Sequence, residues 1–176
     1  MLARRAFLAA LLALPWAGAQ ARPSELGAEL PGARLLGQGL LRFLGLRVYD
    51  ARLWVSEGFK PEEYLRHPIA LELEYARELV GKRIAERSLI EMRKVGEVPE
   101  EKAAAWLAAM EQAFPDVKAG DRITGLYRPG EGMRFFVNGK AGREVRDAAF
   151  AALFIGIWLS PRTSEPALRR TLLGLS

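Results

Sequence analysis

The stretch Ile69-Ala70-Leu71-Glu72-Leu73-Glu74-Tyr75 sets the framework for the whole chain. Large apolar residues alternate in it with an alanine and two glutamates. This period of two is typical of a β-strand with one face on a core and the other in water. We therefore expect Glu72 and Glu74 on a solvated face, and Tyr75 on the core side with the leucines.

The flanking patterns extend this strand into a complete domain. Upstream, residues 33–55 are apolar and predict two strands, or one long strand with a bulge at Gly45, where the alternation changes phase. Downstream, apolar spacing and turn residues predict helices over 80–94, 99–114, 148–159 and 164–173, and strands over 121–127, 132–137 and 141–145. This order predicts one α+β domain, with a mostly antiparallel sheet and helices packed on one face.

The residue inventory excludes several kinds of chemistry. The chain has 176 residues, 50% of them hydrophobic, which suits a single globular domain, but no cysteine and only one histidine, His67. The chain therefore lacks the residues needed for disulfides, thiolate nucleophiles, paired-histidine metal sites and most histidine-dependent triads. Gly37 and Gly39 begin a dinucleotide-binding pattern that fails at Arg42. We expect no metal and no cofactor.

The first twenty-one residues have the features of a secretory signal peptide. Arg4 and Arg5 precede an apolar run over 6–14, and small residues follow, with cleavage expected after Ala19 or Ala21. The apolar run is too short to span a bilayer, so we expect no transmembrane anchor after its removal. The sequence then divides into a signal peptide (1–21), a leader segment (22–32) and a domain (33–174), and predicts a periplasmic or secreted protein.

The charge of the remaining chain argues against nucleic acid as a partner. Removing residues 1–21 takes away two arginines and no acids, which leaves 24 basic and 21 acidic side chains and a net charge of +3. Nucleic-acid binding domains usually cluster their lysines and arginines. In this chain the basic residues are interspersed with acids.

Arg34 is the cation that the sequence singles out. It stands between Gly32-Ala33 and Leu35-Leu36, where the first strand is expected to begin. A guanidinium at the edge of an apolar cavity could clamp a carboxylate or phenolate with two hydrogen bonds. The alternatives are a strand-edge arginine that meets solvent and an internal ion pair.

Four segments, in this order, resemble the chalcone isomerase-like family over residues 33–174. They are Gly39-Leu40-Leu41-Arg42-Phe43-Leu44-Gly45-Leu46-Arg47-Val48-Tyr49-Asp50, Phe114-Pro115-Asp116-Val117-Lys118-Ala119-Gly120-Asp121-Arg122, Phe135-Phe136-Val137-Asn138-Gly139 and Phe154-Ile155-Gly156-Ile157-Trp158-Leu159-Ser160-Pro161. The last resembles the exported bacterial members. The resemblance implies an open-faced β-sandwich. It also implies one of two activities: the plant enzymes cyclise chalcones, whereas other members bind fatty acids through an arginine and neighbouring hydroxyls.

Carried over residue by residue, the resemblance keeps some of the family's polar groups and loses others. The family's arginine falls on Arg34, and its turn hydroxyl falls on Thr163 or the next residue. Three groups of the enzyme's site fall on Leu44, Ile84 and Glu91, where a hydroxyl, a tyrosine and an asparagine are expected. Such donors supply much of an enzyme's rate enhancement. Their loss favours binding over catalysis. Two tyrosines, Tyr49 and Tyr75, keep phenols on the sheet.

Three functions remain open at this stage. The first is a non-catalytic protein that binds a small lipophilic acid such as a fatty acid, with Arg34, Tyr49, Tyr75 and Thr163 as ligand-binding residues. The second is an intramolecular lyase (isomerase) of chalcone type. The third is a structural or interaction module of the cell envelope whose cavity is filled by its own side chains. An open or a plugged cavity distinguishes the first from the third.

Overall fold

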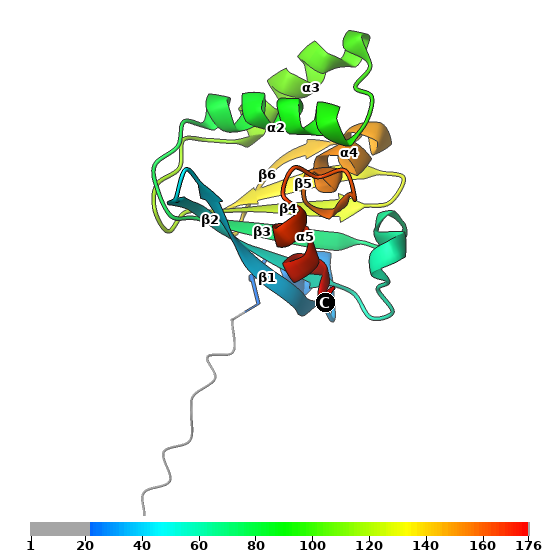
Figure 1. Cartoon of the computed structure of the whole chain (residues 1–176). Coiled ribbons are helices and arrows are strands. Elements are labelled where there is room, and N and C mark those ends of the chain that lie inside the picture. The colour runs from blue at the N-terminus through cyan, green and yellow to red at the C-terminus, as the bar shows by residue number, and fades with distance from the viewer. Residues whose placement is uncertain (1–21, 176) are drawn as a thin grey trace, which may run out of the picture.

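The sheet is a six-stranded antiparallel meander (Figure 1). This is a computed structural model that describes residues 22–175, so the expected signal peptide lies outside the described residues. The strands pair in chain order, each with the next. They are β1 (Arg34–Phe43), β2 (Leu46–Val55), β3 (Ile69–Tyr75), β4 (Arg122–Arg128), β5 (Gly132–Val137) and β6 (Lys140–Val145).

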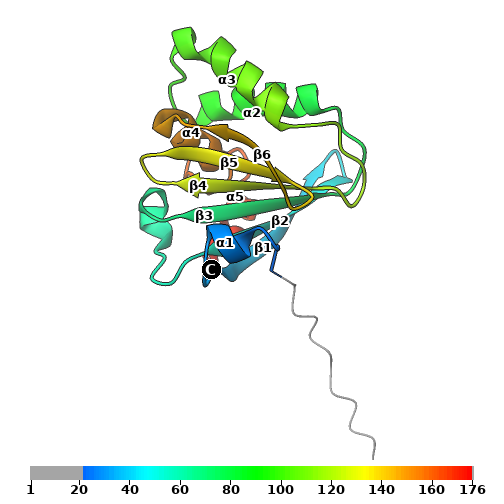
Figure 2. The ribbon, with the colours of Figure 1, turned by 180° about the vertical axis from the view of Figure 1, so that it is seen from behind.

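The long helices lie on one face of this sheet, which confirms the expected α+β architecture (Figures 1 and 2). The helix α4 (Ala148–Leu159) packs on β4 and β5, and α5 (Pro166–Leu173) packs on β1 and β2. The helices α2 (Gly81–Val95) and α3 (Glu100–Ala113) pair with each other, and α2 also contacts α4. A short 3-10 helix, η1 (Pro61–Arg66), joins β2 to β3. Within residues 22–175, none of the helices is long and apolar enough to cross a membrane.

Glycines in β1 allow α5 to approach the sheet closely. A Cβ atom on Gly37 would lie 2.3 Å from the carbonyl oxygen of Thr171, and one on Gly39 would lie 2.6 Å from a methyl carbon of Leu168. Real Cβ atoms essentially never make contacts this short, and the atom that Gly37 would meet belongs to the backbone, which cannot move aside as the Leu168 side chain can. These glycines therefore serve helix packing.

Residues 22–32, expected to be a leader, are instead folded against the opposite face of the sheet (Figure 2). They contain the short helix α1 (Leu26–Glu29), and Leu26 and Leu30 are buried with apolar residues of β2–β5. The Glu29 carboxylate accepts hydrogen bonds from Arg128 at 2.6 Å and Arg134 at 2.8 Å. These residues fold because α1 covers apolar side chains on the face of the sheet that was expected to be exposed to solvent.

Glu72 is buried on this same face, so the expectation that it is solvated was wrong. Only 2% of its surface is exposed. Its carboxylate accepts hydrogen bonds from Trp54 Nε1 at 3.0 Å, Arg52 at 3.1 Å and Arg122 at 3.2 Å. A buried carboxylate needs such partners, because an unpaired one is very costly. These partners come from β2 and β4, and the alternation within β3 does not reveal them.

Asp147 fixes the start of α4. Its carboxylate accepts the backbone N–H groups of Ala149 and Phe150, which an N-terminal helical turn otherwise leaves unpaired. It also accepts hydrogen bonds from Lys102 and Trp106 of α3, at 2.9 and 3.1 Å. One side chain thus caps α4 and ties it to α3.

We expect Asp147→Ala to lower the free energy of unfolding by about 1–2 kcal/mol, because both the cap and the link to α3 are lost. Urea denaturation at neutral pH measures the difference. Asp147→Asn is the matched control: it keeps an acceptor for the cap but not the charge opposite Lys102, and we expect a smaller loss. Equal stability of the alanine variant and the original protein would contradict this account.

Candidate functional site

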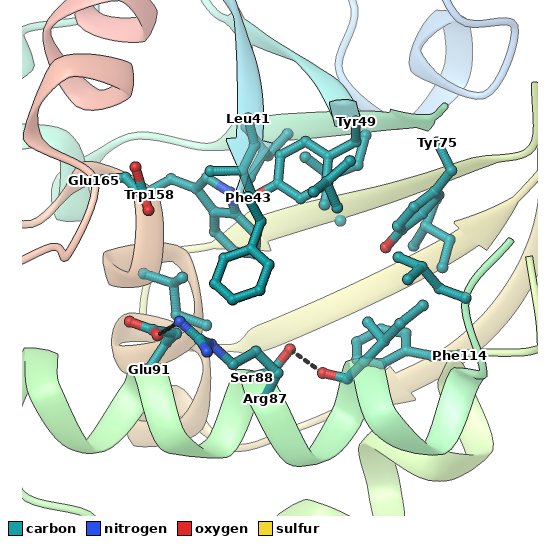
Figure 3. A pocket seen from close by; sticks show the side chains of 18 of the residues that line it. Leu41, Phe43, Tyr49, Tyr75, Arg87, Ser88, Glu91, Phe114, Trp158 and Glu165 are labelled. Atoms are coloured by element: carbon teal, nitrogen blue, oxygen red, sulfur yellow. Dashed lines mark hydrogen bonds and ion pairs between the residues drawn. The ribbon is translucent and has the colours of Figure 1, made fainter. Parts of the chain in front are cut away.

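A cavity of about 290 Å³ lies between the sheet and the helices α2 and α4 (Figure 3). Its size is near the lower end of small-molecule sites, which run from about 300 to 1,000 Å³. The sheet contributes apolar and aromatic side chains, and the helices close the opposite side. The lining residues include Tyr49, Leu71, Leu73, Tyr75, Ile123 and Phe135 of the sheet, and Ile84, Ser88, Phe154, Ile157 and Trp158 of the helices.

The placement of the helices explains why this space stays open. The sheet-packing helices α4 and α5 lie on β4–β5 and β1–β2, whereas the cavity lies against Leu71, Leu73 and Tyr75 of the intervening β3. The cavity is therefore built into the packing of the sheet.

Tyr49 places a hydrogen-bonded phenol in this cavity. The indole Nε1–H of Trp158 donates to its hydroxyl oxygen at 2.9 Å, which joins β2 to α4 (Figure 3). Its ring packs edge-on against Tyr75, with ring centroids 5.9 Å apart. Burial raises the pKa of Tyr49 far above its ordinary value. The phenol therefore stays neutral and keeps its proton at physiological pH.

Tyr75 differs from Tyr49 in having no partner for its hydroxyl. Only 3% of the surface of Tyr75 is exposed, and its hydroxyl points into the cavity (Figure 3). Among the side chains and backbone groups of residues 22–175, none forms a hydrogen bond with this hydroxyl. Burial also raises the pKa of Tyr75 well above its ordinary value. A neutral O–H donor without an acceptor is thus available to whatever occupies the cavity.

Arginines surround one side of the cavity. Arg42 of β1, Arg77 before α2, and Arg83 and Arg87 of α2 contribute to its lining. Arg87 forms an ion pair with Glu91 at 2.6 Å. Among residues 22–175, Arg77 and Arg83 have no ion-pair partner. Their guanidinium groups are exposed and able to meet an anion.

Glu91 is an acid of the lining, and it is already engaged. It is 7% exposed and accepts hydrogen bonds from Ser164 and Lys94 besides its pair with Arg87. Burial acts to raise the pKa of Glu91, but these hydrogen bonds and positive charges outweigh it and lower the pKa below its usual value. Glu91 lies eight residues beyond Arg83, or roughly 12 Å along the helix. An anion beside Arg83 is therefore well separated from this carboxylate.

The structure brings together two of the four residues expected to bind a ligand. Tyr49 and Tyr75 line the cavity. Thr163 does not line it: its hydroxyl donates to the Ile157 carbonyl at 2.5 Å and accepts from Glu165 N–H at 3.1 Å, which closes the turn after α4. Ser164, next to it, does line the cavity.

Arg34 is not brought to the cavity either. It is exposed at the far end of the first hairpin, paired with Val55, whereas β1 lines the cavity from Leu41 onward. Seven residues of extended chain separate Arg34 from Leu41, which is roughly 23 Å. The anion-binding role expected of Arg34 is untested, and an anion in this cavity would meet other arginines.

Sequence reasoning did not identify Arg77, Arg83 or Arg87 as residues of the site. A signal was present, because Arg83 and Arg87 flank Ile84 and Ser88, which share one face of a predicted helix. Ile84 and Glu91, where the resemblance placed an enzyme's tyrosine and asparagine, do line the cavity. Leu44, where a hydroxyl was expected, lies in the turn between β1 and β2 with 86% of its surface exposed.

Comparison with known proteins agrees with this architecture. The sequence model of the chalcone isomerase-like family matches residues 28–174. An uncharacterized protein of Haemophilus influenzae is 30% identical over 127 residues, which cover 72% of this chain and 61% of that protein. The chain thus spans less than two thirds of that relative's length. The crystal structure of a fatty-acid binding protein of Arabidopsis thaliana has a similar fold, with a TM-score of 0.62 and 13% identity over 81% of this chain and 87% of that one.

The chain therefore belongs to the chalcone isomerase-like family. Within residues 22–175, no group of three or more histidine, cysteine, aspartate or glutamate side chains is arranged to hold a metal ion. The polar groups of the cavity are neutral phenols, two serines, guanidinium groups and two carboxylates: Glu91, which is engaged, and Glu165, which is exposed and has no ion-pair partner among the described residues. This set is suited to hydrogen bonding and to anion pairing.

The two tyrosines make a matched pair for measurement. We expect Tyr49→Phe to lower the free energy of unfolding by about 1–2 kcal/mol, because the buried Trp158 N–H loses its acceptor. Tyr75→Phe removes a hydroxyl that has no partner, and we expect a change of less than roughly 0.5 kcal/mol. Chemical denaturation of both variants gives the comparison, and equal losses would contradict the difference in hydrogen bonding between the two hydroxyls.

Glu91 provides a pH-dependent test. Its lowered pKa means that its contribution to stability is present at neutral pH and is lost as the pH falls through that pKa, which lies below the ordinary value of a glutamate. We expect Glu91→Gln to cost about 1.5–3 kcal/mol at neutral pH. The difference from the original protein should shrink in acid when unfolding is measured across pH. A difference that is independent of pH would contradict the assigned ion pairs.

Proposed function

We propose that the chain binds a small lipophilic acid, such as a fatty acid, in the cavity and does not transform it. The observation that carries this proposal is an open apolar cavity bordered by arginines that have no ion-pair partner among the described residues. The apolar tail would lie against Leu71, Leu73 and Phe135. The carboxylate would meet Arg83 and Arg77, because guanidinium groups pair well with carboxylates.

Two further points support binding by this chain. The cavity is open and not filled by its own side chains, which favours a binding protein over a purely structural module. The Arabidopsis protein of similar fold is a fatty-acid binding protein, although at 13% identity the likeness concerns the fold. We also propose, from the pattern in residues 1–21, that the protein acts in the periplasm or after secretion.

The same cavity argues against chalcone-type catalysis. A reacting ketone and its bridging water need several aimed donors, and Ile84 supplies none where the resemblance placed a tyrosine. Leu44 supplies none either, since its side chain is exposed on a turn. Tyr75 offers one donor, and its raised pKa prevents it from acting as a base. A spectrophotometric chalcone assay tests this, and flavanone formation clearly above the spontaneous rate would overturn it.

Calorimetry with decanoate tests the site directly. We expect Arg83→Gln to weaken decanoate binding about tenfold, because a charge-assisted hydrogen bond to the carboxylate is lost. Arg34→Gln is the matched control, an exposed arginine at the far end of β1, and we expect it to leave the affinity unchanged.

Decanol, which has the same tail without the charge, separates the roles of cavity and clamp. We expect decanol to bind the original protein and the Arg83→Gln variant with similar affinity. Loss of decanoate binding in Arg34→Gln but not in Arg83→Gln would move the clamp to Arg34. Failure of both ligands to bind would overturn the proposed function.

A further inference from the structure

The turn between β1 and β2 presents apolar side chains to solvent. We define the hairpin tip as residues 42–47. Within it, the exposed fractions are 57% for Phe43, 86% for Leu44 and 56% for Leu46. These are the three most exposed large apolar residues of the part of the chain that the structure describes. They gather on one turn, and such clustering distinguishes an interaction site from scattered exposure.

A second hairpin of the same chain shows that Leu44 is a poor choice for this turn. Leu44 and Gly45 have φ angles of 49° and 80°, and Asn138 and Gly139, between β5 and β6, have the same values. Asparagine tolerates a left-handed backbone, whereas a bulky residue such as leucine is disfavoured there. Leu44 is therefore unfavourable both for its backbone conformation and for its exposure. Contact with a partner would explain it.

Positive charge surrounds the tip. In residues 42–49 and 76–84, which lie at the same end of the sheet, there are five cations and one acid, Glu78. Arg47 pairs with Asp50 nearby. The chain as a whole is far more balanced in charge, so these two segments are locally basic. The cations are Arg42, Arg47, Arg77, Lys82 and Arg83.

The tip also adjoins the cavity. Arg42 and Phe43 belong both to the tip and to the cavity lining, and Arg77 and Arg83 contribute from the other side. In Figure 3 the Phe43 ring lies at the cavity, between Trp158 and Arg87. Whatever contacts the tip therefore lies beside the cavity.

We propose that the hairpin tip docks on the surface of a bilayer that contains anionic phospholipid. Leu44, Phe43 and Leu46 would enter the boundary between headgroups and acyl chains, and the arginines would meet the phosphates. A small apolar protrusion ringed by cations fits this interface, where apolar burial and attraction to anionic lipid add together. A protein partner would instead need roughly 800 Å² of complementary surface on each side. This proposal goes beyond ligand binding and stands without a ligand in the cavity.

Co-sedimentation with vesicles tests the proposal, using the ligand-free protein. We expect binding to phosphatidylglycerol vesicles, weak binding to phosphatidylcholine vesicles, and a decline of the former with added salt. Leu44→Asn copies the turn of the second hairpin, so it should fold at least as stably as the original. We expect it to lower the partition coefficient at least about tenfold, because the most exposed apolar side chain is lost.

Two further variants complete the design. Leu65→Asn is the matched control. Leu65 is 39% exposed and lies in η1, which follows the end of β2 opposite the tip. We expect this variant to leave vesicle binding unchanged. Arg77→Gln should weaken binding to phosphatidylglycerol about fivefold.

Three results would overturn the proposal. They are no binding to anionic vesicles, equal losses in Leu44→Asn and Leu65→Asn, or, in sedimentation velocity, a dimer of the lipid-free protein that Leu44→Asn abolishes without any vesicle binding. The last would reassign the tip to self-association. Decanoate calorimetry on Leu44→Asn keeps the two proposals apart, because Leu44 does not line the cavity and we expect ligand binding to survive.

Discussion

The rest of the structure depends on one constraint: the apolar cavity over β3 is not filled by side chains. The helices α4 and α5 pack on the strands to either side of β3, and α2 lies across the space between. Close packing is the rule in protein interiors, so an open cavity has to be held open by its surroundings. Asp147 fixes the start of α4, and Trp158 ties that helix to Tyr49 of β2. The walls of the cavity are thereby set before any ligand arrives.

The chemistry of the cavity follows from its burial. Low polarity keeps the phenols of Tyr49 and Tyr75 neutral, so they can donate hydrogen bonds but do not act as bases. Glu91 is ionised, but Arg87, Lys94 and Ser164 already engage its carboxylate. Arg77 and Arg83 have no ion-pair partner among the described residues and lie where the cavity meets the basic segments around the hairpin tip, and the lining acid Glu165 has no such partner either. Such an arrangement favours an apolar guest with an anionic head.

Much of the fold could be predicted from local patterns, because each element carries its own periodicity. The uncharged run over 148–159 is a helix with those bounds, and the strand at 69–75 is placed where alternation put it. Glu72 shows where this reasoning ends: alternation tells which face a side chain is on, but not that α1 and arginines from other strands cover that face. Tyr75 was predictable as an inward-facing residue, and Tyr49 only as a residue of the sheet. Arg77 and Arg83 were not identified, because their approach to the cavity depends on how α2 crosses the sheet.

The central claim is that the cavity holds a lipophilic acid unchanged. Mass analysis of what copurifies with the protein from the cells that produce it tests this most directly, because it requires no assumption about which acid is bound. The account predicts an organic acid with an apolar tail, close to one molecule per chain, released by solvent extraction and chemically intact. Recovery of a cyclised product would contradict it. So would the absence of any lipophilic acid, if the purified protein also failed to bind lipophilic acids added to it.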